Sequence, residues 1–290
     1  MDVTRLDDVE ARPRNVAVGE FDGVHLGHRE VIRGSDTVLT FEPHPLQVVR
    51  PEAAPSLLTS LDRKIELLDG LGVEELVLIE FDHAFAERSA QDFVDDVLVD
   101  RLRAQRVSVG ENFRFGHHAQ GDAAMLASQD AFETRVTPLV EVDDEIVSST
   151  LIRHLVQLGD VERAARLLGD PFQLRGIVVT GDKRGRTLGY PTANVIPDES
   201  LVYPGHGVYA ALANGHPAAV SVGVRPTFGT GRAVLVEAFL IDFDGDLYGT
   251  ELRLDFLRRL RGERAFASVD ALVEQMGRDV EQAATVTRRP

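Results

Sequence analysis

The sequence predicts two domains of different fold class: an α/β domain with a parallel sheet covered by helices on both faces, then an antiparallel β-barrel or sandwich. In the first half, β-branched runs alternate with helical patterns, whereas short strands separated by turn residues occupy most of the second half. The 290 residues exceed the usual size of one domain. Residues 1–156 carry 30 acidic and 15 basic side chains, whereas residues 157–290 carry 17 and 16, so the halves also differ in charge.

The first domain is expected to alternate strands and helices. Apolar and β-branched runs predict its strands, at Asn15–Val18, Val38–Phe41, Leu76–Phe81, Arg106–Gly110 and Thr137–Val142. Apolar residues at helical spacing predict its longer helices, at Ser60–Leu71 and Ala90–Ala104. The helix after the first strand is expected to be short and to end near Gly34, because only nine residues, 29–37, separate His28 from the next strand.

Two helices are expected between the domains, at Thr150–Leu158 and Val161–Leu168. Asp160 is suited to cap the second of them, because its carboxylate can accept from free backbone N–H groups. The predicted divisions are an α/β domain at 1–156, a helical linker at 157–170 and a second domain at 171–290.

The second domain is predicted from the spacing of its turns. Residues such as Asn214–Gly215 separate short strands up to about residue 257, which is typical of an antiparallel barrel or sandwich. A closing helix is expected at Ser268–Arg278, with Ser268 as its cap. Residues 285–290 are expected to be a frayed tail.

The composition excludes several kinds of site. The chain has no cysteine, which excludes disulfides, zinc fingers, iron–sulfur clusters and cysteine nucleophiles. No apolar run reaches the ~18 residues of a membrane span, and the acidic, polar N-terminus is unlike a secretory or transit peptide. The net charge of −16 is unfavourable for nonspecific nucleic-acid binding. We therefore expect a cytoplasmic protein whose partners are neither nucleic acids nor membranes.

Residues 16–28 carry the most informative pattern of the first half. A strand leads into a turn containing Gly19 and Gly23, and a helix begins close behind it. Free N–H groups at a helix start favour phosphate, and glycine lets a ligand approach the backbone. His25 and His28 are expected on one helical face, where they could stabilise charge on a polyphosphate. A metal-binding pair and an ordinary glycine turn with surface histidines are the alternatives.

Three later segments could reach the same site. Residues 40–45 (TFEPHP) follow a strand, and residues 109–116 (VGENFRFG) place Asn112 and Phe113 at a turn after another. Residues 147–153 (VSSTLIR) begin a helix with three hydroxyl groups and an arginine one turn later, a second arrangement that favours phosphate.

Together these four segments resemble the N-terminal adenylyltransferase module of the bacterial bifunctional riboflavin kinase/FAD synthetase family, a Rossmann-like fold with an HxGH element. The resemblance implies that the phosphate of FMN attacks the α-phosphate of ATP, with Mg²⁺ assisting and no protein nucleophile. It implies catalytic roles for His25, His28 and Arg153. Phosphate or ATP contacts are implied for Gly19, Phe21, Asp22, Gly23, Gly27, Ser149 and Thr150. Flavin or nucleotide contacts are implied for Asn112 and Phe113.

Residues 176–195 carry the second pattern, GIVVTGDKRGRTLGYPTANV. Its glycines predict a loop between strands, and its basic residues supply cations for phosphates. Thr192 and Asn194 alternate on a strand-like stretch, so that both oxygens face one side and suit Mg²⁺ held mainly by a nucleotide. Ordinary strand propensity is the alternative explanation for the threonine.

This segment is identified as the riboflavin kinase signature, and further segments between residues 204 and 266 recur in that family's order. The resemblance implies a Greek-key β-barrel with a C-terminal helix, in which Glu237 is the catalytic base and Thr192 and Asn194 are metal ligands. ATP or phosphate contacts are implied for Gly181, Lys183, Gly185, Arg186, Gly189 and Pro191. Flavin contacts are implied for Arg261, Glu263 and Phe266.

We therefore expect a bifunctional enzyme that converts riboflavin to FMN and FMN to FAD, with ATP as co-substrate and Mg²⁺ as cofactor. Its partners would be these small molecules, and its oligomeric state a monomer or a weak homo-oligomer. Two alternatives stay open. One is a riboflavin kinase whose first module has decayed, which only the short segment after His28 favours, and the other is a non-catalytic flavin-binding regulator.

Overall fold

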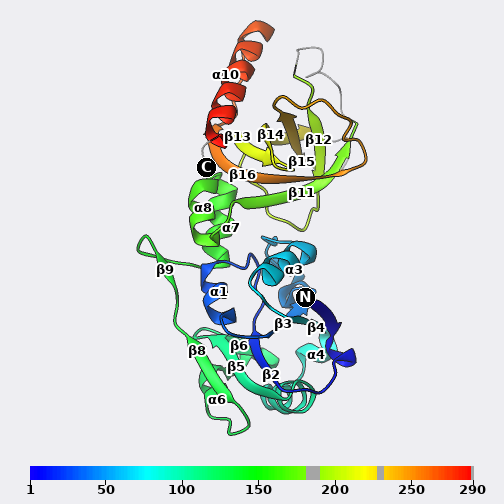
Figure 1. Cartoon of the computed structure of the whole chain (residues 1–290), viewed down its shortest axis with the longest axis vertical. Helices are drawn as coiled ribbons and strands as arrows, with labels where there is room; N and C mark the ends of the chain where they lie inside the picture. The colour runs from blue at the N-terminus through cyan, green and yellow to red at the C-terminus, as the bar shows by residue number, and fades with distance from the viewer. Residues whose placement is uncertain (181–189, 227–231, 289–290) are drawn as a thin grey trace. The chain divides into compact units, whose positions relative to one another are not determined.

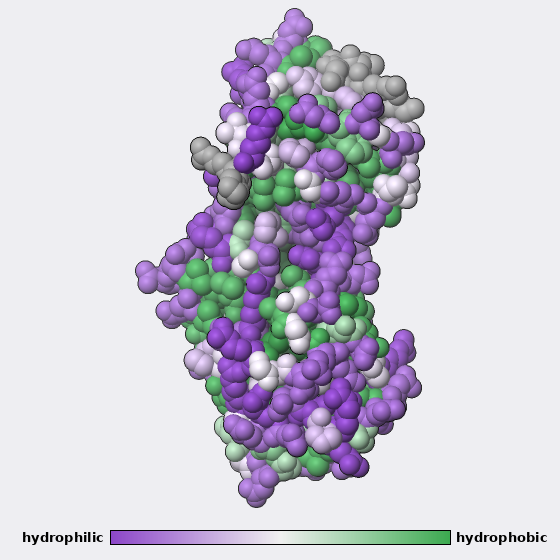
Figure 2. Space-filling view, in the orientation of Figure 1, coloured by the Kyte–Doolittle hydropathy of each residue, from purple (hydrophilic) through white to green (hydrophobic). Residues whose placement is uncertain are grey.

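The computed structural model describes residues 1–180, 190–226 and 232–288. Contacts divide the chain into two compact units, Met1–Ser149 and Thr150–Pro290. The division lies within the helix Ser149–Leu158. The same helix contains residue 156, at which the first domain is predicted to end. Among the described residues no helix has the length and apolar character needed to cross a membrane. Hydrophilic residues cover most of the face seen in Figure 2.

The first unit is built on a six-stranded sheet in which every neighbouring pair of strands is parallel (Figure 1). Its strands, in sheet order, are β1 (Asp2–Arg5), β4 (Glu75–Glu80), β3 (Thr37–Glu42), β2 (Arg14–Val18), β5 (Ala104–Gly110) and β8 (Glu133–Thr137). Its helical segments are η1 (Leu6–Asp8), α1 (Leu26–Ile32), α2 (Pro45–Val49), η2 (Pro51–Ala53), α3 (Leu61–Gly70), α4 (His83–Ala86), α5 (Ala90–Asp92), η3 (Phe93–Arg101), η4 (His117–Ala119) and α6 (Ala123–Ala127). Two small antiparallel pairs are β6 (Arg114–Phe115) with β7 (Gly121–Asp122), and β9 (Glu141–Val142) with β10 (Glu145–Ile146).

Each face of this sheet has its own hydrophobic core. Val16 of β2 belongs to the cluster that contains Val97 of η3. The next residue, Ala17, belongs to the opposite cluster, with Ile32 of α1 and Leu68 of α3. Successive strand residues point to opposite faces, so both faces must be covered by helices. The predicted parallel sheet with helices on both faces is confirmed.

The helix predicted at Ala90–Ala104 ends earlier, at Arg101. Its last turns are π-helical, and the N–H of Leu102 donates to Val97 O at 3.0 Å. Ala104 already belongs to β5, so the predicted C-terminal end of this helix is wrong.

The strand predicted at Thr137–Val142 is also wrong in position. Strand β8 ends at Thr137, and the following Pro138 has no N–H with which to continue the ladder. Glu141–Val142 forms the separate strand β9. The edge strand β1 was not predicted, because its sequence is polar and largely exposed.

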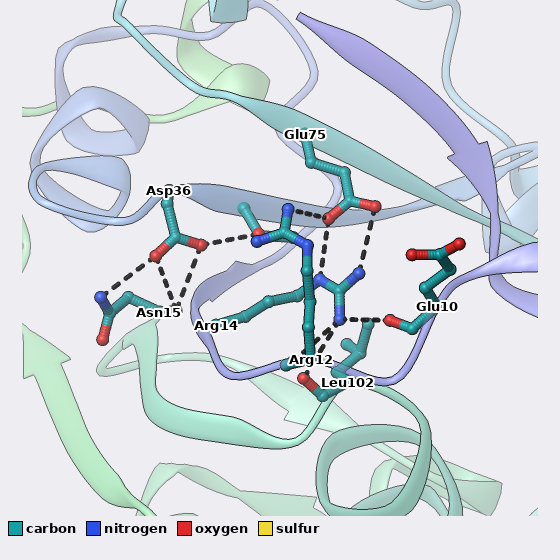
Figure 3. Close-up of polar contacts among 8 residues, drawn as sticks. Glu10, Arg12, Arg14, Asn15, Asp36, Glu75 and Leu102 are labelled. Atoms are coloured by element: carbon teal, nitrogen blue, oxygen red, sulfur yellow. Dashed lines mark hydrogen bonds and ion pairs between the residues drawn. The ribbon is translucent and has the colours of Figure 1, made fainter.

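A buried polar network joins the amino ends of β2, β3 and β4 (Figure 3). The guanidinium of Arg14, which is 1% exposed, donates to the Glu75 carboxylate from Nε (2.8 Å) and Nη2 (3.2 Å). Arg12 Nη2 donates to the same carboxylate at 2.8 Å. Beside them, the Asp36 carboxylate accepts from the backbone N (3.0 Å) and Nδ2 (3.1 Å) of Asn15. These contacts hold the starts of three neighbouring strands, and so help to set how their carboxyl ends are aligned.

The second unit is a closed antiparallel barrel of six strands. In barrel order they are β11 (Phe172–Val179), β12 (Ala193–Pro197), β15 (Arg232–Leu240), β14 (His216–Pro226), β13 (Gly207–Ala213) and β16 (Glu251–Arg261). The two-residue turn Asn214–Gly215 joins β13 to β14 with φ values of 47° and 84°, as such tight hairpins require. The predicted barrel is confirmed.

In the described part of this unit, three helices accompany the barrel: α7 (Ser149–Leu158), α8 (Val161–Leu168) and α10 (Val269–Thr287). As predicted, Asp160 caps α8 and Ser268 caps α10. Helix α10 packs against β13, β14 and β16 (Figure 1) and is much longer than predicted. The frayed tail expected from residue 285 is wrong up to Thr287, because Ala283 is buried and Thr287 Oγ1 donates to Ala283 O at 2.9 Å.

Candidate functional site

The turn after β2 has an unusual backbone. Phe21, Gly23 and Val24 all have positive φ, at 49°, 89° and 40°. Glycine adopts this conformation freely, whereas a β-branched residue such as valine rarely does. Strained residues of this kind persist only where the surroundings hold them, and they cluster at functional sites.

Three other parts of the unit hold this turn. Glu20 O accepts from Lys64 Nζ of α3 at 2.8 Å and from Thr40 Oγ1 of β3 at 3.1 Å. The buried Asp22 carboxylate accepts from the backbone N–H groups of Leu58 (2.9 Å) and Thr59 (3.1 Å). The turn is therefore a fixed element, even though its contacts come from segments far away in the sequence.

His25 and His28 come together at the end of this turn. His25 is the N-cap of α1 and lies outside the helix, so the prediction that both residues occupy one helical face is wrong. The rings nevertheless stack, with centroids 3.5 Å apart and planes at 18°. The edge of Phe21 meets the His28 ring at 5.3 Å. A Cβ at Gly27 would lie 3.2 Å from His25 Cε1, so this position favours glycine.

The cap determines how His25 can act. Its Nδ1 accepts from the backbone N of His28 at 3.3 Å, so in the neutral ring the proton is on Nε2. His25 is only 5% exposed. An imidazole N–H donor beside a fixed turn can stabilise negative charge on a bound phosphate. Among the described residues, no group of three or more His, Asp and Glu side chains could hold a metal ion, so the metal-pair alternative has no third ligand there.

Glu20 and Lys64 were not predicted as site residues. The Lys64 side chain is buried, and burial raises the pKa of Glu20 to about 8, with the Asp22 and Glu42 carboxylates adding to the increase and Lys64 opposing it. One signal in the sequence was available, because Lys64 is one of only two lysines and lies in a helix with apolar spacing. Its contact to Glu20 joins residues 44 positions apart and was not predictable from local pattern.

The order of the strands places the other predicted segments at the same edge of the sheet as the glycine turn. Strands β3, β2 and β5 are neighbours and parallel, so their carboxyl ends meet at one edge. Residues 43–45 follow β3, and Asn112 and Phe113 follow β5 in a turn closed by a bond from Phe113 N to Gly110 O (3.0 Å). Asn112 is exposed, and the Phe113 ring stacks on Phe115 at 5.6 Å.

Ser149, the last residue of the first unit, lies beside the turn. Ser149 Oγ donates to Asp22 O at 2.9 Å, which joins the first residue of α7 to the glycine turn. Thr150 and Arg153 follow on α7 and belong to the second unit. Thr150 is exposed and Arg153 is half-buried.

The second unit brings Asn194 and Glu237 together. They are direct register partners on the adjacent strands β12 and β15, and such partners have Cβ atoms about 4.5–5.5 Å apart. Strand β14 is the other neighbour of β15, and its Ser221 is a second register partner of Glu237. Val195 and Val236 are buried inside the barrel, so Asn194 and Glu237, one position away, lie on its outer face. Ser221 was not predicted as a site residue.

Of the other residues predicted for the second site, only some lie in the described part of the chain. Thr192 precedes β12, which begins at Ala193, so it lies just outside the strand on which it was expected to alternate with Asn194. Pro191 is exposed. The predicted contacts Gly181, Lys183, Gly185, Arg186 and Gly189 lie outside the described residues.

The predicted flavin contacts lie at the end of β16 and in the segment after it. Arg261 forms an ion pair with Asp279 of α10, with Nη2 at 2.8 Å from Oδ2. The Phe266 ring centroid is 5.7 Å from Arg261 Cζ. Glu263 is exposed and lies 3.6 Å from His206 Nδ1. Asp279 was not predicted as part of this group.

Comparisons with known proteins cover nearly the whole chain. A FAD synthetase family model matches residues 7–151, and a riboflavin kinase model matches residues 168–287. The bifunctional riboflavin kinase/FMN adenylyltransferase of Bacillus subtilis is 38% identical to this chain, covering 92% of this chain and 90% of its own length. The protein of the same name from Escherichia coli K12 is 37% identical, covering 91% and 90%.

A solved structure with a similar fold covers nearly the whole chain. It is a crystal structure from Streptococcus pneumoniae, with a TM-score of 0.89 and 32% identity over 98% of this chain and 99% of its own. That structure is described as a macrolide-efflux protein. Its description differs from those of the family models and the two bacterial relatives, which all name flavin-related enzymes.

Proposed function

Because the chain belongs to the bifunctional riboflavin kinase/FMN adenylyltransferase family, we propose that it makes FAD from riboflavin in two ATP-dependent steps. The kinase module, residues 171–290, forms FMN, and the adenylyltransferase module, residues 1–156, converts FMN to FAD. Residues 157–170 are the helical linker. The enzyme acts in the cytoplasm on these small molecules, as a monomer or weak homo-oligomer, without nucleic-acid or membrane partners.

The register pairing of Asn194 with Glu237 is the observation that best supports the kinase step. Glu237 accepts the proton of the riboflavin 5′-hydroxyl as that oxygen attacks the γ-phosphorus of ATP, and ADP leaves. Arg261, Glu263 and Phe266 bind the flavin. The ATP phosphates are bound by Gly181, Lys183, Gly185, Arg186, Gly189 and Pro191.

Mg²⁺ fits the donors beside Glu237. A threonine hydroxyl and an asparagine amide oxygen are hard ligands, and Mg²⁺ at phosphate-transfer sites needs few protein ligands because the nucleotide supplies others. Thr192 and Asn194 would hold the ion. When bound, Mg²⁺ offsets the negative charge of the phosphates.

The adenylyltransferase step needs position and charge stabilisation more than covalent chemistry. The phosphate oxygen of FMN attacks the α-phosphorus of ATP, and the bond to pyrophosphate breaks. His25 and His28 donate to the phosphates, with Arg153, Ser149 and Thr150 contributing from α7. ATP or its phosphates are also bound by Gly19, Phe21, Asp22, Gly23 and Gly27, and Asn112 and Phe113 contact the flavin or nucleotide.

A kinase-only enzyme is the second candidate, because the segment after His28 is short. Helix α1 nevertheless has seven residues, and its Val31 and Ile32 are buried in the core of the first unit. The short crossover thus still forms a helix packed on the sheet, which favours a working first module.

Product analysis separates the candidates. Purified protein with riboflavin and Mg·ATP should yield FAD, with one ADP and one pyrophosphate released per FAD. Protein supplied with FMN instead should yield FAD and pyrophosphate without ADP. FMN as the only flavin product would support the kinase-only candidate. Flavin binding without any turnover of ATP would support the non-catalytic regulator.

A further inference from the structure

Helix α10 carries two buried polar residues on one face. Gln275 and Asp279 are one turn apart and are only 8% and 3% exposed. Carboxylates are rarely buried so deeply unless they are paired. Within the described residues, these two side chains contact each other and two arginines, Arg261 at the end of β16 and Arg264 just after it.

Asp279 holds the guanidinium of Arg261. Arg261 Nε lies 3.1 and 3.0 Å from the two carboxylate oxygens, and Nη2 lies 2.8 Å from Oδ2. Gln275 Nε2 donates to Asp279 Oδ1 at 2.7 Å. The carboxylate therefore receives donors from both side chains, and a forked contact of this kind defines the plane of the guanidinium.

Gln275 extends the network to a second arginine. Its Oε1 accepts from Arg264 Nη2. Both guanidinium groups lie beside the same aromatic ring, with Cζ at 5.7 Å (Arg261) and 4.7 Å (Arg264) from the Phe266 centroid. These distances allow cation–π attraction, which further restricts the ring and both arginines.

Stability alone does not explain this arrangement. A buried ion pair loses hydration on both partners, and replacing such a pair by apolar residues is often neutral or stabilising. What the contacts supply is geometry: they fix two flexible arginine side chains relative to a ring. Planar cations and an aromatic face are surfaces on which a flat ring system with carbonyl groups can be bound.

We infer that Asp279 and Gln275 are positioning residues for riboflavin, orienting Arg261, Arg264 and Phe266 from α10. The inference rests on the proposed function, in which Arg261 and Phe266 contact the flavin. Asp279 does not touch riboflavin itself; it acts through Arg261. Arg264 becomes an additional flavin-side residue.

The test is the affinity of riboflavin in the Asp279→Asn variant of the full chain. The substitution keeps the shape of the side chain and removes its charge. We expect the KM and the Kd for riboflavin, the latter from quenching of its fluorescence, to rise about 10- to 100-fold, the loss expected for a charge-assisted hydrogen bond. The KM for ATP in the kinase reaction and the rate of FAD formation from FMN should stay within about twofold.

Glu274→Gln is the matched control, because Glu274 forms an exposed ion pair with Arg278 on the same helix, at 2.9 Å. It should leave riboflavin affinity unchanged. Because Asp279 acts through Arg261, Asp279→Asn should add little to the defect of Arg261→Ala in a double variant. Thermal unfolding of each variant identifies loss of fold, and if Asp279→Asn does not fold, Gln275→Met is assayed in the same way, with a smaller increase expected.

The outcomes are distinct. Wild-type protein that makes no FMN contradicts the proposed function. Wild-type activity with unchanged riboflavin affinity in a folded Asp279→Asn variant contradicts the positioning role alone. Additive defects in the double variant, or equal losses for riboflavin and ATP, also contradict it, because they indicate a general structural role.

Discussion

Asn194 and Glu237 are direct register partners on neighbouring barrel strands, and both lie on the outer face of the barrel. An amide oxygen that can help to hold a metal ion is thereby placed beside a carboxylate that can accept a proton. These two functions are needed together when a hydroxyl group attacks the γ-phosphate of ATP. The pairing depends on strand register alone, since a shift of one residue would turn either side chain into the barrel.

Glu237→Gln tests the base. The amide keeps the size of the side chain but accepts a proton poorly, so FMN formation should fall about 100-fold or more. FAD formation from supplied FMN should be unchanged. Glu251→Gln, at an exposed position of β16, is the control and should keep both activities. Equal loss of both activities in Glu237→Gln would show that the division of work between the modules is wrong.

His28→Ala tests the stacked histidine pair. Removing one donor to a developing charge costs about 100-fold or more in rate, so FAD formation from FMN should fall by that factor. FMN formation from riboflavin should remain. His83→Ala, at an exposed position of α4, serves as the comparison. Normal FAD synthesis by His28→Ala would remove the imidazole pair from the mechanism.

Lys64→Met tests how the glycine turn is held. Methionine fills similar space but cannot donate to Glu20 O, so the turn should be held less firmly. FAD formation should therefore fall about tenfold or more. Arg63→Met, on the same helix and paired with Glu66 instead, should have little effect. Steady-state assays with FMN and ATP measure the difference. A Lys64→Met protein with wild-type rates would mean that the turn is held well enough by Thr40 and Asp22.

Glu20 should make stability depend on pH. Its folded pKa of about 8 is above the 4.5 of an unperturbed glutamate, so between these values the folded state binds a proton that the unfolded state has released. The contribution of Glu20 to stability is therefore complete below pH 4.5 and is lost as pH rises towards 8. Across this window the unfolding free energy of wild type should fall by up to about 1.4 kcal/mol more per pH unit than that of Glu20→Gln. Denaturant titrations at several pH values measure this difference. Parallel curves for the two proteins would contradict the raised pKa.

Arg14→Ala tests the network at the amino ends of the strands. Breaking a buried ion pair leaves the Glu75 carboxylate buried with reduced compensation and should cost about 3–5 kcal/mol of unfolding free energy. Arg5→Ala removes an exposed pair with Glu80 and should cost at most about 1 kcal/mol. Urea unfolding followed by circular dichroism compares the two. Similar losses in both variants would mean that burial does not determine the contribution of these pairs.

Local pattern was sufficient for much of the fold. Apolar runs such as Leu76–Phe81 predicted buried parallel strands because both faces of this sheet are covered. Asn214–Gly215 predicted a turn between strands, and such residues readily adopt the positive φ values that this turn has. The polar edge strand β1 has neither signal and was not predicted. The end of η3 was misplaced because its closing π-type bond has no sequence signature.

Local sequence pattern also predicted part of the candidate site. Segments at strand ends, such as the turn with Gly23, could be located because the carboxyl ends of parallel strands share an edge. Lys64 and Asp279 were missed because their roles come from contacts to distant residues, Glu20 and Arg261, that periodicity does not encode. Ser221 was missed because only the barrel register makes it a neighbour of Glu237.

Complementation between two variants tests most directly whether one chain carries two separate ATP-dependent sites. Neither Glu237→Gln nor His28→Ala should make FAD from riboflavin efficiently, since the first lacks the base for FMN formation and the second adenylylates FMN slowly. An equal mixture with Mg·ATP should restore FAD formation, because FMN released by one variant is the substrate of the other. A mixture that forms no more FAD than the variants do separately would contradict the account.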